Sequence, residues 1–252
     1  MTGGTVAVVP LRDGVSGKSR LAAALDPAAR RRLVAALARH VVAVLRASDG
    51  VDRVLVVTAD VPFAVETLGP DARVGSSGSA RQLELPRRAG TAAPGEPPVE
   101  IMAQPPKRPG LNAALDVGRE LAVERGAARL VVAHADLPLL GTDDVAALLA
   151  AGAPSAGAPP DDADGPATAV VATDRHLAGT NLLALPAAAP FAFRFGEGSR
   201  AAHVAEAERA CLRAVVLRRP GTAVDLDTVD DWAELPRAVR DRLRRGLDLP
   251  LP

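Results

Sequence analysis

The chain has 252 residues, with 30 basic and 30 acidic side chains and therefore no formal net charge. Hydrophobic residues make up 48% and aromatic residues only 2%, which excludes a basic or base-stacking nucleic-acid-binding face and requires a largely aliphatic core. One cysteine rules out an intrachain disulfide, four scattered histidines argue against zinc, and no apolar run of about 18 residues predicts a membrane span. We expect a soluble, cytoplasmic protein.

Strand-like and helix-like segments alternate along most of the sequence. Strands are predicted at residues 5–9, 53–58, 72–74, 99–103, 129–133, 167–174, 181–185, 213–217 and, briefly, 224–228. Helices are predicted at residues 27–48, 62–69, 109–126, 142–150 and 199–210, followed by a polar helix near the end. This order predicts an α/β fold with a doubly wound, mostly parallel sheet in one domain, residues 1–252. The segments 75–98 and 151–166 are predicted to be flexible insertions.

The loop after the first strand, RDGVSGKSR, ends like a phosphate-binding P-loop. The P-loop pattern, however, requires glycine where Arg12 stands, because the backbone there wraps a phosphate with positive φ. A P-loop is therefore excluded. Arg12, Lys18 and Arg20 still bring three cations to the end of a strand, where they could bind a triphosphate. The alternative is a surface turn with solvated charges.

Three carboxylates follow predicted strands or stand in extended segments. Asp136, in HADLP, comes directly after a strand, where α/β enzymes place metal ligands, and Mg²⁺ can be held by one aspartate, water and phosphate. A helix cap is the alternative, although Thr142 is expected to cap the next helix. Asp225 and Asp227 share one face of an extended segment, so either could be the partner carboxylate. One of them, or Thr228, should cap the helix that follows.

Two glycine-containing turns carry further polar groups. The turn GTN places Thr180 at the start of a strand, and the turn RFGEGS contains Gly196 and ends at Ser199, which we expect to cap a helix. A helix N-terminus with a hydroxyl group is suited to binding an anion, although an ordinary capped turn explains the same residues. Neither Ser19 nor Ser199 lies in the strand–turn–helix setting of a hydrolase nucleophile, so a catalytic triad is not supported.

Six motifs, in this order along the chain, resemble the guanylyltransferases of deazaflavin coenzyme (F-420) biosynthesis. They are KSRL from Lys18, PGLNAAL from Pro109, ADLPLL from Ala135, GTN from Gly179, RFGEGS from Arg194 and DLDT from Asp225. The family includes 2-phospho-L-lactate and phosphoenolpyruvate guanylyltransferases, and its fold is like that of nucleotide-diphospho-sugar transferases (GT-A type). The resemblance covers nearly the whole chain apart from the two predicted insertions.

The resemblance implies an enzyme that moves GMP from GTP onto the phosphate of a small phosphorylated carboxylic acid, with release of pyrophosphate. Lys18 and Arg20 would act in catalysis by holding the GTP phosphates, with Ser19 beside them, and Asn112 would line the guanine site. Asp136 would be catalytic as a ligand of Mg²⁺, which neutralises charge at the α-phosphorus and orients the attacking oxygen. No side-chain nucleophile is required, because the acceptor phosphate is already anionic.

The resemblance also implies a second metal ligand, Asp225 or Asp227, and an acceptor site. Thr180, Gly196 and Ser199 would bind the acceptor carboxylate through hydroxyl and backbone N–H groups. The Arg- and Ala-rich composition resembles that of actinobacteria, whose members of the family are associated with phosphoenolpyruvate, so phosphoenolpyruvate is the expected acceptor. The alternatives are 2-phospho-L-lactate and 3-phosphoglycerate. A direct hand-over of the product to the next enzyme of the pathway is a further expectation.

Two other classes of protein remain open at this point. One is a nucleotidyltransferase that acts on molybdopterin or a sugar phosphate, although the glycine-rich opening loop of those enzymes is not matched here. The other is a non-catalytic nucleotide-binding protein, which would bind GTP without turning it over.

Overall fold

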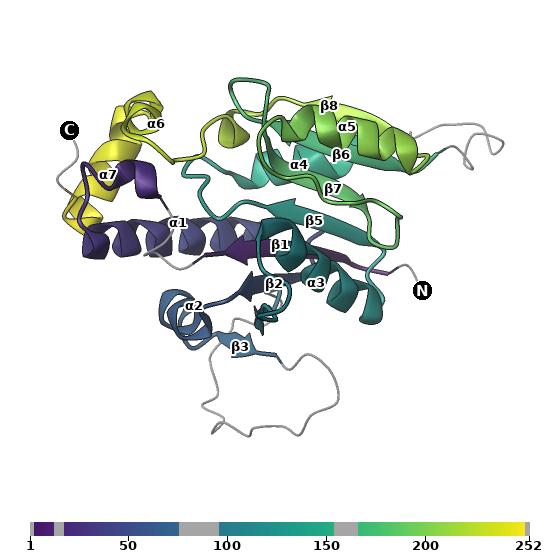
Figure 1. Ribbon diagram of the computed structural model, residues 1–252, viewed down its shortest axis with the longest axis horizontal. Coiled ribbons are helices and arrows are strands. Elements are labelled where there is room, and N and C mark those ends of the chain that lie inside the picture. Colours follow the sequence, from purple (N-terminus) through teal and green to yellow (C-terminus); the bar gives the residue numbers. More distant parts are fainter. Residues whose placement is uncertain (1–2, 13–17, 76–95, 154–165, 250–252) are drawn as a thin grey trace.

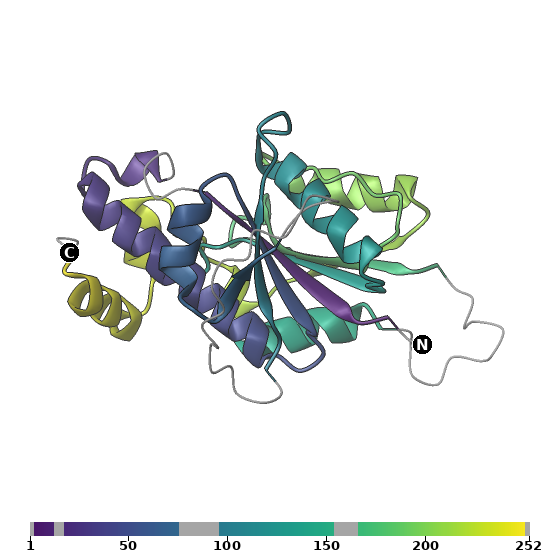
Figure 2. The ribbon, with the colours of Figure 1, turned by 90° about the horizontal axis from the view of Figure 1, so that it is seen from below.

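Helices cover both faces of one eight-stranded sheet in the computed structural model (Figures 1 and 2). The structure describes residues 3–12, 18–75, 96–153 and 166–249. The predicted insertions at 75–98 and 151–166 therefore fall almost wholly outside the described residues, as does the GVSG part of the opening loop. Within the described ranges, no helix is long and apolar enough to cross a bilayer.

The bounds of the elements follow the predicted order closely. The strands are β1 (Thr5–Leu11), β2 (Arg53–Thr58), β3 (Ala72–Val74), β4 (Val99–Ala103), β5 (Arg129–Ala133), β6 (Thr168–Thr173), β7 (Thr180–Pro186) and β8 (Arg213–Leu217). The α-helices are α1 (Pro27–Ala47), α2 (Val61–Leu68), α3 (Leu111–Glu124), α4 (Thr142–Ala151), α5 (Ser199–Arg209), α6 (Val229–Glu234) and α7 (Arg237–Leu247). Two short 3-10 helices are η1 (Ser19–Leu21) and η3 (Pro220–Thr222).

The strand order is β3-β4-β2-β1-β5-β7-β6-β8, and β7 alone runs antiparallel to its neighbours. The predicted mostly parallel sheet is therefore confirmed. β1 pairs with β5 in parallel, so the loops that follow these two strands leave the sheet side by side. Because β7 is reversed, its first residues lie at the same edge, with Leu182 paired to Ala133 at the end of β5.

The alternation of side chains along β1 separates two hydrophobic cores. Ala7 and Val9 belong to the core that α1, α2 and α4 cover, while Val6 and Val8 belong to the core under α3 and α5. A third cluster lies on the other side of α1, where the buried Trp232 of α6 packs with the segment around η1. This third cluster fixes the C-terminal segment against η1 and the first turns of α1, as Figure 1 shows at the N-terminal end of α1.

Two predicted helix caps are wrong by one residue. Thr142 is the first residue of α4, whose N-cap is Gly141, and the N–H of Gly141 donates to Asp144 Oδ2 at 3.0 Å. Ser199 is the first residue of α5, whose N-cap is Gly198 with a φ of 68°. In both cases a glycine takes the cap position, so the hydroxyl of the next residue is left for other contacts.

The strand predicted at 224–228 is not part of the sheet. Instead, Leu226 N donates to the carbonyl of Asp136 at 3.0 Å, so this segment runs beside the loop after β5. Thr228, not Asp225 or Asp227, caps α6, because its Oγ1 accepts from the N–H of Asp231 at 3.1 Å. Both aspartates are therefore left available for another role.

Helix α3 approaches the sheet at Gly118, where a Cβ atom would lie 2.5 Å from Val8 Cγ1. The substitution Gly118→Ala is expected to lower the free energy of unfolding by about 1–3 kcal/mol, because the methyl group must displace a packed core residue. Gly246→Ala in α7 is the matched control, since nothing lies within 4 Å of that Cβ position. It should stabilise by about 0.5–1 kcal/mol. Urea denaturation measures both, and similar effects at the two sites would contradict the close approach.

Candidate active site

Lys18 forms the centre of a charged cluster at the carboxyl edge of the sheet. Its Nζ lies 2.6 Å from Asp136 Oδ2 and 2.5 Å from Asp227 Oδ1, and only 7% of the lysine side chain is exposed. Burial by itself disfavours the ammonium ion, but the two carboxylates outweigh it, and the pKa of Lys18 is raised. The group is thus a cation at every physiological pH.

Main-chain and side-chain hydrogen bonds place the two carboxylates around Lys18. The carbonyl of Asp136 accepts from Leu226 N, which joins the loop after β5 to the DLDT segment. Asp231 Oδ2 accepts from the N–H of Asp227 at 3.1 Å, and its other oxygen pairs with Arg175 at 2.9 Å. Asp231, in the first turn of α6, therefore orients the loop that carries Asp227.

Asp225 lies beside this pair and is held by Asn181 of β7. Asn181 Nδ2 donates to the carbonyl of Thr222 at 2.9 Å and reaches Asp225 Oδ1 at 3.4 Å. Burial raises the pKa of Asp225, and the neighbouring carboxylates of Asp136 and Asp227 raise it further. For Asp136 burial acts in the same direction, but the charge of Lys18 prevails and lowers its pKa.

The backbone of Lys18 adopts a conformation that is uncommon for a side-chain-bearing residue. Its φ is 58°, in the left-handed region, which costs roughly 1–2 kcal/mol for an L-residue other than glycine. This strained backbone occurs at Lys18, whose ammonium group forms ion pairs with both Asp136 and Asp227. Strain of this kind concentrates at functional sites, which supports a functional role for Lys18.

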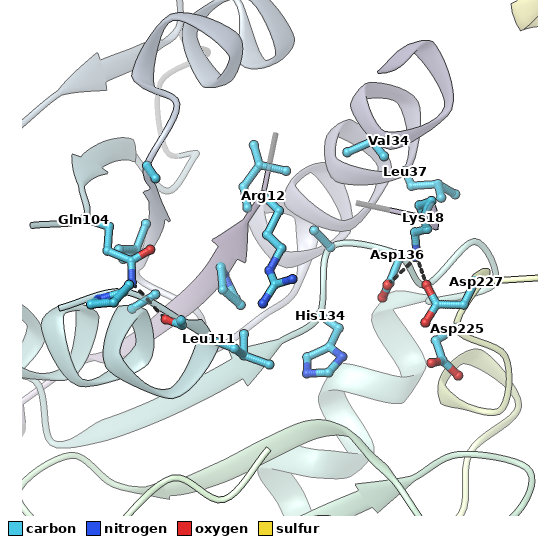
Figure 3. A pocket seen from close by; sticks show the side chains of 18 of the residues that line it. Arg12, Lys18, Val34, Leu37, Gln104, Leu111, His134, Asp136, Asp225 and Asp227 are labelled. Atoms are coloured by element: carbon cyan, nitrogen blue, oxygen red, sulfur yellow. Dashed lines mark hydrogen bonds and ion pairs between the residues drawn. The ribbon is translucent and has the colours of Figure 1, made fainter. Parts of the chain in front are cut away.

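A cavity of about 730 Å³ opens over the carboxyl ends of β1, β2, β4 and β5. In Figure 3 the charged cluster lies at one end of the cavity, Gln104 and Leu111 lie at the other, and Arg12 and His134 lie between them. The apolar part of the wall comes from Pro10, Leu11, Val34, Leu37, Val57, Ala59, Pro105, Pro106, Pro109, Leu111 and Ala114. This volume suits a ligand of nucleotide size.

Several predicted site residues are not among the described residues that line this cavity. Arg20 is exposed on η1. Asn112 uses its amide on Phe195, accepting from the backbone N–H at 2.9 Å and donating to the carbonyl at 3.2 Å. The side chain of Ser19 lies outside the described part of the structure. The structure thus brings together Lys18 and the three carboxylates, but not the predicted GTP-binding set as a whole.

The residues predicted to bind the acceptor form an internal network. Thr180 N donates to Ser199 Oγ at 2.9 Å, and both side chains are buried. His203 Nε2 accepts from Arg194 N at 2.9 Å, so its Nδ1 carries the proton and donates to Thr180 Oγ1, also at 2.9 Å. Gly196 is exposed, with a φ of 136°. The two hydroxyls therefore hold the turn before α5 against β7.

Sequence reasoning missed Gln104 and His134 as cavity residues. Both follow the carboxyl end of a strand, which is the signal that identified Asp136. The ring of His134 packs against Phe195 with centroids 5.0 Å apart, and its Nε2 is buried with no hydrogen-bond partner among the described residues. An unpaired polar atom at the wall of a cavity is available to a ligand.

The carboxylate cluster suits a hard divalent cation. Three carboxylates and one ammonium leave a formal charge of −2 when all are ionised, and Asp136 Oδ1 is buried without a partner among the described residues. In the described ranges, no group of three or more His, Cys, Asp or Glu side chains is placed so that it could hold a metal ion. Mg²⁺ is usually bound by one or two carboxylates with water and substrate phosphate, so these residues fit it.

The fold places this chain in a recognised class of α/β protein. A solved structure from Desulfovibrio desulfuricans G20, described as a nucleotide-diphospho-sugar transferase, superimposes with a TM-score of 0.66 at 16% identity, covering 98% of this chain and 97% of that one. At that identity the likeness concerns the fold alone. It shows that this chain has a fold like that of the nucleotide-diphospho-sugar transferases.

Sequence comparisons identify the family within that class. The family model for CofC-like guanylyl transferases matches residues 95–238. A phosphoenolpyruvate guanylyltransferase from Rubrobacter xylanophilus is 37% identical over 242 residues, 95% of this chain and 98% of the relative. A second phosphoenolpyruvate guanylyltransferase, from Sphaerobacter thermophilus, is 37% identical over 92% of each chain. A 3-phospho-D-glycerate guanylyltransferase from Phenylobacterium zucineum is 31% identical over 92% of this chain and 89% of that relative. The chain belongs to the CofC-like guanylyltransferase family, as its motifs predicted.

The buried His203 predicts a dependence of stability on pH. Burial lowers its pKa from 6.5 to about 4, the charge of His134 adds to this, and Glu206 opposes it. The neutral ring therefore stabilises the fold fully above pH 6.5, and this contribution is lost as the pH falls towards 4. Between pH 7 and 4 the wild type should lose about 3 kcal/mol more of its unfolding free energy than His203→Gln. Urea denaturation at both pH values tests this, and parallel losses would contradict it.

Proposed function

We propose that this protein transfers GMP from GTP to the phosphate of phosphoenolpyruvate and releases pyrophosphate, a step of coenzyme F-420 biosynthesis. The observation that carries the proposal is the position of Lys18 between Asp136 and Asp227, in a nucleotide-sized cavity at the carboxyl edge of the sheet. The names of the relatives support GTP as the donor and phosphoenolpyruvate as the acceptor.

In this reaction an oxygen of the acceptor phosphate attacks the α-phosphorus of GTP, and the bond to the pyrophosphate group breaks. Both reactants are polyanions, so the cleft must offset their repulsion. Lys18 uses two of its three N–H groups on carboxylates, and the third, which has no partner among the described residues, can donate to a phosphate oxygen. Arg12, between the two ends of the cavity, adds a second cation along the path of the triphosphate.

Mg²⁺ belongs to the proposal as a cofactor held by Asp136 together with Asp225 or Asp227. When bound, it would neutralise charge on the phosphates and so favour attack at the α-phosphorus. Leu226 N donates to the main-chain carbonyl of Asp136 and Asn181 Nδ2 donates to the carboxylate of Asp225, so the segments that carry these residues are already joined before a cation binds.

For the acceptor site, we propose a less direct role for Thr180 and Ser199 than the sequence suggested. The hydroxyls of Thr180 and Ser199 bond to protein groups, so these residues would act by holding the turn that contains Gly196 beside the cleft. The relative named for 3-phospho-D-glycerate makes that acid the second candidate acceptor. The chemistry at the α-phosphorus is the same for either acid.

The acceptor is tested by incubating the protein with GTP, Mg²⁺ and one acid at a time. We expect pyrophosphate release with phosphoenolpyruvate, and its loss on addition of EDTA, because the carboxylate cluster then lacks its cation. The acids compared are phosphoenolpyruvate, 2-phospho-L-lactate and 3-phospho-D-glycerate. If pyrophosphate is released with only one of the other acids, that acid is the acceptor. If it is released with none of the three, the proposed function is contradicted.

Asp136→Asn should lower kcat by at least about 100-fold, because it removes a charge that the proposal assigns to the metal while keeping the side chain's size. Asp241→Asn, on α7 and outside the described cavity lining, is the control and should turn over like the wild type. Steady-state pyrophosphate release measures both variants, with circular dichroism to show that each is folded. A wild-type rate for Asp136→Asn would remove this carboxylate from the mechanism.

A further inference from the structure

Gln104, the first residue after β4, has a side chain that the protein holds in one orientation. Its Nε2 donates to the carbonyl of Arg108 at 2.6 Å and to the carbonyl of Gly110 at 2.8 Å. Its backbone N–H continues the sheet by donating to the carbonyl of Thr58 at 2.7 Å. Two carbonyl acceptors on one side of the amide require the nitrogen there, so the carboxamide oxygen must face away from them.

The carboxamide oxygen of Gln104 is directed into the cavity. Figure 3 shows the dashed bond from the amide nitrogen on one side, and the oxygen turned to the side on which Arg12 lies. No hydrogen bond to this oxygen is found within the described part of the chain. It is thus an acceptor in a fixed position, and none of the described residues donates a hydrogen bond to it.

The loop that holds Gln104 is itself braced against α3. The guanidinium of Arg108 makes a two-pronged ion pair with Glu120, at 2.7 and 2.8 Å. An exposed pair of this kind adds little stability, but its parallel geometry fixes the position of the Arg108 main chain. The acceptor of Gln104 is therefore pre-organised before any ligand arrives, which reduces the entropy lost on binding.

The surroundings of Gln104 suit a flat ring rather than a charged group. Leu111 lies at the same end of the cavity in Figure 3, away from the cluster at Lys18. Pro105 and Pro106, which follow Gln104 in the chain, also line the cavity. Proline rings and aliphatic side chains can cover the faces of a base in a protein with so few aromatic residues. A single polar acceptor in such a wall is typical of the groups that give a pocket its specificity.

We propose that Gln104 selects guanine, because its carboxamide oxygen accepts hydrogen bonds from N1–H and the 2-amino group of the base. The inference rests on the proposed function, since a nucleotide with its phosphates near Lys18 has its base at the end of the cavity where Gln104 lies. Adenine presents an acceptor at N1 and a C–H group at C2, so it would leave the amide oxygen of Gln104 unpaired. Unpaired polar groups of this kind are what give such pockets high discrimination.

The test compares GTP with ITP, which keeps N1–H but lacks the 2-amino group. The wild type should prefer GTP over ITP by about tenfold in kcat/KM, the expected effect of one hydrogen bond. In Gln104→Met, which keeps the length of the side chain but not its acceptor, we expect this preference to fall to twofold or less. The loss should appear in KM, with kcat for GTP changed little. A residue with only a structural role would lower kcat/KM for both nucleotides equally and leave their ratio unchanged.

A second variant and a second measurement keep the inference separate from catalysis. Gln104→Ala replaces Gln104→Met if the latter does not fold, as judged by circular dichroism. Calorimetry of GTP and ITP binding to the wild type and the variant, without acceptor, measures the same preference with no turnover. An unchanged GTP to ITP ratio in a folded variant, or no preference in the wild type, overturns the role of Gln104. Absence of pyrophosphate release with normal discrimination in binding would overturn the proposed reaction alone.

Discussion

The ion pairs of Lys18 join three segments that are far apart in the sequence. The lysine follows β1, Asp136 follows β5 and Asp227 precedes α6, and the pairs span 118 and 209 residues. Removing one partner of a buried pair typically costs about 3–5 kcal/mol, whereas a well-packed apolar replacement of both is often neutral or better. The cluster is therefore poorly explained as a source of stability. A cleft that must hold cations against phosphates explains both the buried charges and the strained backbone of Lys18.

The parts of the site that follow from sheet topology could be predicted from the sequence. Parallel strands deliver their carboxyl ends to one edge, so an aspartate directly after a buried strand was expected to lie beside the opening loop, and Asp136 does. The antiparallel direction of β7 could also have been predicted from the sequence. Only six residues separate the end of β6 from Thr180, whereas a parallel crossover needs about a dozen or more, so a hairpin was the available connection.

The partners of short polar side chains could not be predicted in the same way. Asn112, Thr180 and Ser199 stand at the starts of elements, where an amide or hydroxyl serves a ligand or the protein equally well. Their actual partners, such as Phe195 for Asn112, lie up to 83 residues away and follow no periodicity. Gln104 and His134 were missed for a simpler reason, because the rule applied to carboxylates after strands was not applied to neutral polar residues.

The third hydrophobic cluster, in which Trp232 packs near the start of α1, has a consequence for synthesis of the protein. Lys18 is made 209 residues before its second carboxylate partner, Asp227. Closing so long a loop carries a large entropic cost, which the contacts of the C-terminal helices must offset. A nascent chain therefore has most of its sheet but not its complete charged cleft. Cleavage of the chain between β8 and Asp225 would likewise separate the eight strands of the sheet from Asp225 and Asp227.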